Sequence, residues 1–199
     1  MRIHIANYEP DRMGGGWTAA RYLYEGLEGT SYDECDIYLI TGPTMASHDQ
    51  VLKAKADGKK IVLRLDNAVR DSRNRGTGMS RMLAFCHAAD LVIYQSEWAK
   101  RFLMPFTGKD GPVILNGVDT DRFNSKNRTA PDDSYLYVRS SRDEGKQWVM
   151  AWYYFANNPG KLSIVGKFSN ENLQYGFDFF NNENYQFFGE QSDMAQFYK

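Results

Sequence analysis

The clearest signal in the chain is Pro112-Val113-Ile114-Leu115-Asn116-Gly117-Val118-Asp119-Thr120-Asp121-Arg122-Phe123. The apolar run at 113–115, with a proline before it and Asn116-Gly117 after it, predicts a short buried strand. The Asn-Gly pair tolerates positive φ, so the chain can turn sharply where this strand ends. In an open α/β sheet that end of a strand borders the ligand crevice, and the turn is therefore expected to face a ligand.

Strands and helices are predicted to alternate along the sequence before this stretch. Most of the strands are continuous apolar runs, as expected where helices cover both faces of a parallel sheet. The pattern predicts an α/β fold with one complete Rossmann-like, doubly wound parallel-sheet domain. The predicted strands are 3–7, 36–40, 60–65 and 91–94, and the predicted helices are 17–28, 47–56, 79–89 and 96–103, with Ser47 and Ser96 as N-caps.

A change of composition predicts a domain boundary after the stretch. Residues 125–134 are mostly polar, which is typical of a linker between a first domain at 1–124 and a second at 135–199. The second domain shows strands at 135–139, 162–165 and 185–188 and a helix at 144–157, too few for an independent doubly wound domain. We therefore expect an incomplete second Rossmann-like domain, in a chain that is a fragment without its C-terminal part or a naturally truncated protein.

Composition excludes several classes of protein. The 199 residues are 42% hydrophobic, which suits a folded domain, and the net charge of −1 gives no electrostatic case for nucleic acid. The two cysteines, both among predicted helix or strand residues, argue against a disulfide scaffold. The first residues run into a strand without the apolar core of a signal peptide. No apolar run is long enough for a transmembrane helix. The expected location is the cytoplasm.

Three glycines lie between the first predicted strand and the first predicted helix. Gly14, Gly15 and Gly16 would let the backbone approach a ligand closely, next to a helix N-terminus that favours anionic groups. The spacing does not match the dinucleotide fingerprint G-x-G-x-x-G. A flexible turn and a ligand loop are both compatible with the local sequence.

The strand at 60–65 ends with two charged residues on one side. Arg64 and Asp66 are two positions apart, so the carboxylate can orient the guanidinium or accept hydrogen bonds from sugar hydroxyls. An ordinary surface ion pair is the alternative interpretation.

In the second domain, basic residues lie between a predicted strand and a predicted helix. Arg142 and Lys146, with Arg139 as the alternate, could bind a phosphate group near the helix N-terminus, because arginine offers a fork of hydrogen bonds and lysine a point charge. Arginine and lysine in the first turn of a helix are also common as solvent-exposed residues. Gly189 follows the last predicted strand. The three histidines and two cysteines show no metal-ligand spacing, and there is no nucleophile elbow or P-loop.

The stretch 112–123, with its Asn-Gly-Val-Asp and Asp-Arg-Phe, resembles the interdomain segment of the retaining GT-B glycosyltransferases of family four. The glycine loop, the Arg-x-Asp strand end and the segment 139–146 are similar to other parts of that family. The resemblance implies a GT-B type fold and transfer of a hexose from a nucleoside diphosphate sugar, such as a UDP- or GDP-sugar, with retention and without an obligatory metal or cofactor. The acceptor would be a sugar or another small or lipid-linked molecule, in carbohydrate biosynthesis.

The same resemblance assigns roles to individual residues, with an acceptor-side first domain and a nucleotide-sugar-binding second domain. It implies catalytic roles for Asp66 and Arg64. It implies donor binding by Arg142, Lys146, Arg139, Gly189 and Asn116, and acceptor or sugar binding by Gly14, Gly15, Gly16 and Asp119.

The sequence also departs from the family pattern. Many members carry His-Asp where this chain has Arg64-x-Asp66, and here Gly145-Lys146 replaces Lys-Gly. No glutamate has a second glutamate eight positions later, as the family's pair would require. A truncated, non-catalytic nucleotide- or sugar-binding module is therefore the alternative function, and a dinucleotide-binding oxidoreductase is a weaker third option.

Overall fold

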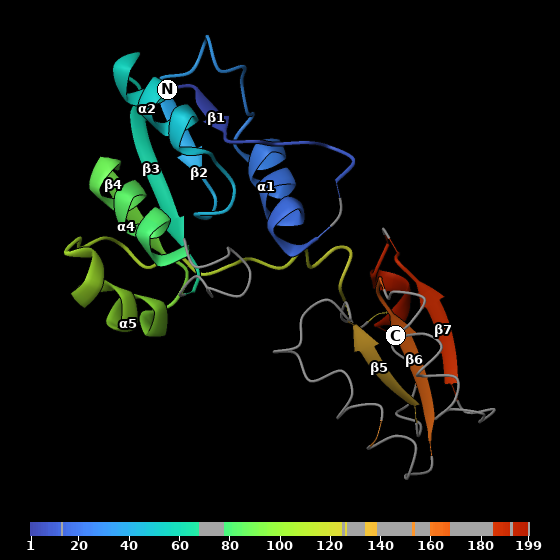
Figure 1. Cartoon of the computed structure of the whole chain (residues 1–199). Helices are drawn as coiled ribbons and strands as arrows, with labels where there is room; N and C mark the ends of the chain where they lie inside the picture. Colours follow the sequence, from blue (N-terminus) through green and yellow to red (C-terminus); the bar gives the residue numbers. More distant parts are fainter. Residues whose placement is uncertain are drawn as a thin grey trace. The chain divides into compact units, whose positions relative to one another are not determined.

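The computed structural model describes residues 1–12, 14–67, 78–124, 126, 134–138, 153, 160–167, 185–191 and 193–198. Contacts along the chain divide it into two units, Met1–Gly117 and Val118–Lys199 (Figure 1). The linker predicted at 125–134 falls almost wholly outside the described residues and stays a prediction.

The first unit is built on a four-stranded parallel sheet whose strands follow one another in sequence order (Figure 1). The alternation of strands and helices predicted from the sequence is confirmed. The strands are β1 (Ile3–Ile5), β2 (Ile37–Ile40), β3 (Lys60–Leu65) and β4 (Leu91–Tyr94), and the helices are α1 (Gly15–Gly26), α2 (His48–Ala56), α4 (Gly78–Ala88) and α5 (Glu97–Thr107).

Helices cover both faces of this sheet. Ala20 of α1 packs with Ile5 and Leu39 on one face. The other three helices pack on the opposite face, where they contact the alternate residues of the same strands. The connections β1–α1–β2 and β2–α2–β3 step across the sheet in the same direction with their helices on opposite faces, so they have opposite hands. Because such connections are nearly always right-handed, one of the two is unusual.

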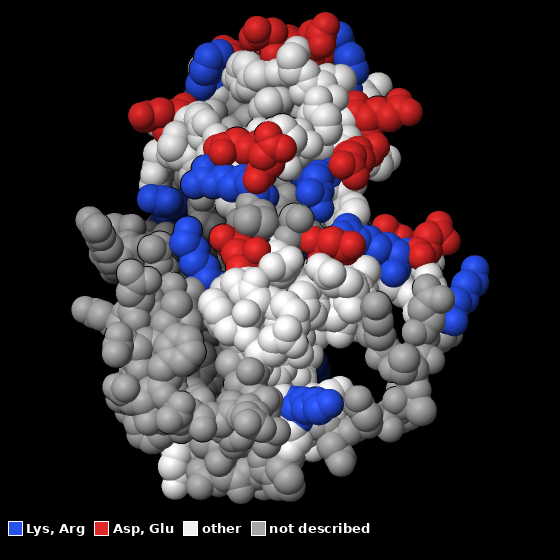
Figure 2. Space-filling model, turned by 90° about the vertical axis from the view of Figure 1, so that its right-hand side faces the viewer, with Lys and Arg blue, Asp and Glu red and all other residues white. Residues whose placement is uncertain are grey.

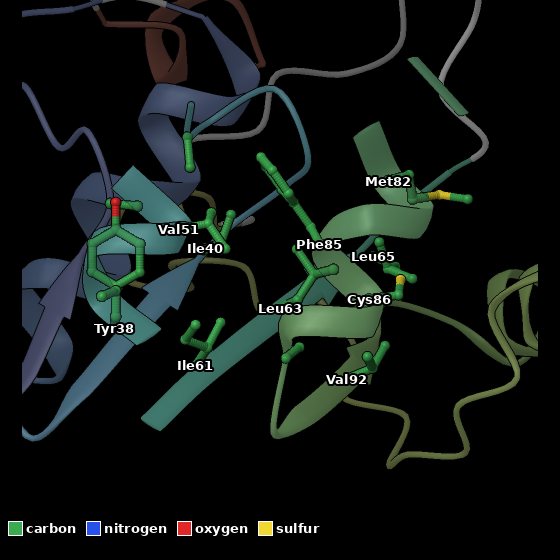
Figure 3. Close-up of a cluster of buried hydrophobic side chains, with 14 of the residues drawn as sticks. Tyr38, Ile40, Val51, Ile61, Leu63, Leu65, Met82, Phe85, Cys86 and Val92 are labelled. Carbon is green, nitrogen blue, oxygen red and sulfur yellow. The ribbon is translucent and has the colours of Figure 1, made fainter. Parts of the chain in front are cut away.

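The main core of the first unit lies between β3 and the helix α4. Strand alternation sends Leu63 and Leu65 to this face, and neither has any exposed surface. Figure 3 shows Phe85 and Cys86 of α4 pointing toward these leucines. Burial of a side chain of this size stabilises the folded state by about 1.5–3 kcal/mol. This core holds β3, and with it the residues at the end of β3.

The predicted N-caps are confirmed. The Ser47 hydroxyl accepts from the Gln50 amide, and the Gln50 side chain accepts in turn from the Ser47 amide, which makes a reciprocal capping box. Ser96 caps α5 by accepting from Ala99. Helix α5 continues to Thr107, past the predicted end at 103, because Gly108 closes it in a left-handed conformation with its N–H bonded to the Met104 carbonyl.

The buried strand predicted at 113–115 is wrong in part. Only Val113 pairs with β4, through a single parallel bridge to Tyr94. Ile114 is 54% exposed and Leu115 is 71% exposed. The pairing stops after one bridge, and no described helix covers these two side chains. An apolar run thus marks where a strand starts but does not ensure its burial.

The second unit contains a three-stranded parallel sheet of β5 (Ser134–Val138), β6 (Lys161–Val165) and β7 (Tyr185–Gly189), in that order. The central strand β6 carries its buried core, Leu162, Ile164 and Val165. A short 3₁₀ helix, η2 (Ala195–Phe197), follows β7. The helix predicted at 144–157 lies outside the described residues apart from one position.

Candidate functional site

The candidate site of the first unit lies where the parallel strands end. Thr41 follows β2 and Asp66 follows β3, while Arg64 is the last residue but one of β3. The register pairs Ile40, the last residue of β2, with Leu63, so Thr41 comes level with Arg64. Carboxyl ends of neighbouring parallel strands meet at one edge of the sheet, which is where α/β proteins bind ligands.

The Arg64 guanidinium is held from two sides at this edge. Its Nη1 donates to the Thr41 carbonyl at 3.2 Å and its Nη2 donates to Asn116 Oδ1 at 2.5 Å. Partial burial lowers the pKa of Arg64, and the negative charge of Asp66 acts in the opposite direction. The group stays cationic near neutral pH, since an arginine is protonated far above that range. The structure thus fixes a positive charge at the end of β3.

The structure brings three of the predicted site residues into this cluster. Arg64 and Asn116 are hydrogen-bonded although 52 positions separate them in sequence. Asp66 is exposed beside them and acts on Arg64 electrostatically. The Asn116 side chain therefore positions the arginine, a role that the sequence does not predict for it.

Thr41 belongs to the same cluster but is not predicted as a site residue. It is only 5% exposed, and its hydroxyl oxygen has no hydrogen-bond partner among the described residues. A buried hydroxyl without a partner is costly, so a water or ligand atom is expected to bond to it. In the sequence, Thr41-Gly42-Pro43 signals only a turn, and nothing in that pattern points to a ligand.

The predicted glycine loop is largely the first turn of α1. The helix begins at Gly15, two residues before the predicted start, and Gly14 precedes it with φ of 126°, a conformation that favours glycine. A side chain at Gly15 would meet nothing within 4 Å. The helix has no side-chain cap and no acidic residue in its first turn. The three glycines at this end of the helix are exposed.

The segment after β2 contacts both the N-terminus of α1 and the arginine cluster, which is made of Thr41, Arg64, Asp66 and Asn116. Its Met45 sulfur lies near Gly16, 3.6 Å from where a Cβ would stand, and its Thr41 carbonyl holds Arg64. The Met45 amide bonds to the Gly42 carbonyl, which closes the turn between these two contacts. One short segment, 41–45, thus contacts both the start of α1 and the arginine cluster.

In the second unit, Gly189 ends β7 with a left-handed φ of 68°, and its carbonyl accepts from the Gly166 amide at 2.8 Å. Asp119 caps its own turn, because its Oδ1 accepts from the amides of Asp121 and Arg122. A structural role thus accounts for the Asp119 carboxylate.

The remaining predicted donor residues lie outside the described part of the chain. These are Arg139, Arg142 and Lys146. Within the described ranges, no group of three or more His, Cys, Asp or Glu could hold a metal ion. None of the helices described in these ranges has the length and apolar character needed to cross a membrane.

Charges of both signs are mixed on one face of the described surface. Figure 2 shows Lys and Arg side chains interspersed with Asp and Glu on the face that it presents. No strongly basic region forms there among the described residues. This agrees with the small net charge and gives no electrostatic support for nucleic-acid binding on that face.

The fold resembles solved structures despite low sequence identity. Anabaena Alr3699/HepE in complex with UDP and glucose matches with a TM-score of 0.73 and 14% identity, over 99% of this chain and 71% of that one. The same protein with UDP alone gives a TM-score of 0.67 at 14% identity, with the same coverage. AviGT4, a glycosyltransferase involved in avilamycin A biosynthesis, gives 0.54 at 13% identity, over 98% of this chain and 65% of its own.

The fold is of the GT-B type. This confirms the predicted fold class, an α/β structure with parallel sheets. No family model matches the sequence, and no curated protein matches it. At such low identity the likeness establishes the fold and leaves the reaction to be argued from the site.

Proposed function

We propose that the chain is a glycosyltransferase that transfers a hexose from a nucleoside diphosphate sugar to an acceptor with retention, in the manner of family four. The observation that carries the proposal is the likeness, over 99% of the chain, to a protein solved with UDP and glucose. The donor is a UDP- or GDP-sugar, the acceptor a sugar or a small or lipid-linked molecule, and the place of action the cytoplasm.

In this proposal the first unit supplies charge at the reacting centre. Arg64 makes two hydrogen bonds among the described residues, and a guanidinium has five N–H donors, so it can also bind an anionic or hydroxyl oxygen. Asp66 is positioned to accept hydrogen bonds from sugar hydroxyls. The amides at the start of α1 add partial positive charge. Preorganised donors of this kind stabilise the charge that develops on a leaving diphosphate.

The second unit binds the donor in this proposal. Arg139, Arg142 and Lys146 contact the diphosphate, and the backbone at Gly189 contacts the base. No metal or other cofactor is assigned, because cationic side chains and helix amides take over the stabilisation of the leaving group.

Calorimetry with UDP, GDP and their sugars tests the donor assignment. We expect the Arg142→Ala/Lys146→Ala variant to bind the preferred nucleotide at least about tenfold more weakly, since each charged hydrogen bond contributes more than a neutral one. Arg101→Ala, an exposed arginine on α5, is the matched control and should leave the affinity unchanged. Unchanged affinity in the double variant would show that the donor site is assigned to the wrong residues.

A transfer assay separates an enzyme from a binding module. We expect Arg64→Ala to lower kcat roughly a hundredfold with little change in nucleotide affinity. The anomeric configuration of the product, read by NMR, tests retention. Nucleotide binding without transfer or hydrolysis across a panel of acceptors would support the non-catalytic alternative.

A further inference from the structure

A cavity of about 360 Å³ opens in the first unit, apart from the residues proposed for transfer. Its walls come from β1, β2, α2 and the segments after β1 and before β2. The lining residues are His4, Asn7, Tyr8, Tyr32, Tyr38, Gln50 and Lys53. This volume lies in the usual range for a small-molecule site.

Tyr38, at the base of the cavity, and Arg64 belong to opposite faces of the sheet. Tyr38 of β2 is paired in register with Ile61 of β3, and both side chains belong to the face covered by α2. Arg64 is three residues after Ile61, so strand alternation sends it to the other face. A ligand in the cavity therefore does not depend on the arginine cluster.

Aromatic rings form a corner in this cavity. The His4 and Tyr38 rings are stacked, with centroids 5.7 Å apart and an interplanar angle of 16°. The Tyr32 ring stands edge-on to both, at 5.8 Å from each. Tyr38 is almost fully buried, whereas His4 and Tyr32 are only partly buried. The corner therefore combines a rigid base with two accessible aromatic edges or faces.

Amide and imidazole groups supply the polar part of the lining. The side-chain N–H of Gln50 donates to Asn7 Oδ1 at 2.6 Å, so the two side-chain carboxamides lie side by side. His4 Nδ1 lies 3.0 Å from the Thr30 carbonyl. A carbonyl can only accept, so Nδ1 carries the proton and Nε2 is the acceptor of the neutral ring. The remaining carboxamide N–H groups can therefore donate to hydroxyl groups, and His4 Nε2 can accept from them.

The charge at the edge of the cavity is already neutralised. Lys53 Nζ pairs with Asp57 Oδ2 at 2.5 Å, and the Tyr32 hydroxyl donates to the same carboxylate at 2.6 Å. The ammonium also lies 4.4 Å from the Tyr32 ring centroid. An anionic ligand would therefore have to compete with a formed ion pair, so a neutral ligand is favoured.

We propose that this cavity binds one pyranose ring of a neutral saccharide. A pyranose presents C–H groups that pack on aromatic rings, and hydroxyls that can both donate to and accept from carboxamides and an imidazole. This ligand class follows from the side chains of the cavity alone. It stands whether or not the chain transfers a sugar from a nucleotide.

Titration of the full chain with neutral methyl glycosides, followed by amide and side-chain NMR, tests the site. We expect a saturable change in the signals of His4, Asn7 and Gln50 with at least one glucoside, galactoside or mannoside at millimolar concentration. The change should persist with saturating UDP, which distinguishes this cavity from the proposed transfer site. Absence of any saturable change, or changes confined to the surroundings of Arg64, would overturn the proposal.

Substitutions at Tyr32 give a second test. Tyr32→Ala removes one aromatic wall and should weaken binding about tenfold, whereas Tyr32→Phe keeps the ring and should bind within about threefold of the parent. Tyr22→Ala removes a half-exposed tyrosine from α1 and should leave the affinity unchanged. Equal weakening by Tyr32→Ala and Tyr22→Ala, or tighter binding of a free nucleobase than of any glycoside, would show that the cavity is not a saccharide site.

Discussion

The two units share parallel strands but fix their candidate site residues by different means. In the first unit, side chains from separate strand ends hold one another, as Arg64 is held by Thr41 and Asn116. In the second unit, the described contacts at Gly189 and Asp119 involve the backbone. A site of the first kind orients a charge, whereas a site of the second kind presents amides and carbonyls. We infer that the two units are suited to different parts of a ligand.

The units also differ in how their sheets are buried. The main cluster of the first unit takes residues from three strands and three helices. The fully buried residues described in the second unit all come from β6. Substitutions that act on one unit alone can therefore show whether each sheet is stable by itself.

The largest effect is expected at Gly111 of the first unit. A Cβ there would lie 1.8 Å from the Val92 carbonyl oxygen, a backbone atom that cannot move without disturbing β4. We expect Gly111→Ala to destabilise the first unit by about 3 kcal/mol or more, measured by chemical unfolding. Gly26→Ala is the matched control, since a Cβ there meets nothing within 4 Å. Similar stability of the two variants would contradict the close contact between Gly111 and the backbone of β4.

The next effect compares the two cores directly. Leu63 of β3 is fully buried and Ile164 of β6 is 4% exposed, so each change to alanine should cost about 2–5 kcal/mol in its own unit. Both cysteines of the chain lie in the first unit. Burial raises the pKa of Cys86 to about 11 and also raises that of Cys35, so neither thiol should react while this unit is folded.

Thiol labelling therefore reports on the first unit alone. We expect Leu63→Ala to accelerate labelling and Ile164→Ala to leave its rate unchanged, while both lower the free energy of unfolding measured by far-UV circular dichroism. Equal acceleration of labelling by both substitutions would mean that the two units unfold together and that neither sheet is stable by itself.

A smaller effect is expected at the helix caps of the first unit. Ser47→Ala removes the hydroxyl of a reciprocal capping box and should destabilise this unit by about 1 kcal/mol. Ser47→Asp is the control, because a carboxylate can accept the same hydrogen bond near the helix N-terminus. Loss of stability in both variants would indicate that the serine acts through a contact other than the cap.

The sequence predicts this architecture best where local pattern and tertiary burial agree. Strands 60–65 and 91–94 have the predicted bounds, since continuous apolar runs between turn residues match a sheet covered on both faces. The run at 113–115 fails because its burial depends on what covers it, and a sequence pattern does not encode that. The opposite faces taken by α1 and α2 likewise depend on tertiary packing alone.

For the candidate site, the sequence identifies residue types but not partners. Arg64 and Asp66 are apparent from their place at a strand end. The contact of Arg64 with Asn116 joins residues far apart in the chain, and only the tertiary fold brings them together. Thr41 has no sequence signal at all, because its interest arises from burial without a described hydrogen-bond partner.

The smallest effect concerns an ion pair of the second unit. Arg122 Nη2 lies 2.6 Å from Asp193 Oδ1, which joins the turn at Asp119 to the segment after β7. The hydrogen bond from Arg122 lowers the pKa of Asp193 below its ordinary 3.8. A lowered carboxyl pKa stabilises the folded state fully above 3.8, and this contribution is lost as the pH falls through the lower folded value. Both groups are partly exposed, so the effect on stability should be smaller than that of a helix cap.

The Ala195 amide offers a direct measure of this titration, because it donates to the same Asp193 oxygen at 3.0 Å. Its NMR shift should titrate with a midpoint below 3.8 in the parent chain. Arg122→Gln should raise that midpoint toward the ordinary carboxyl value, while Arg101→Gln in the first unit should not move it. An unmoved midpoint in Arg122→Gln would mean that Arg122 does not pair with Asp193. The turn that follows Gly117 would then lack this tie to the second unit, and the first unit would have to end later in the chain.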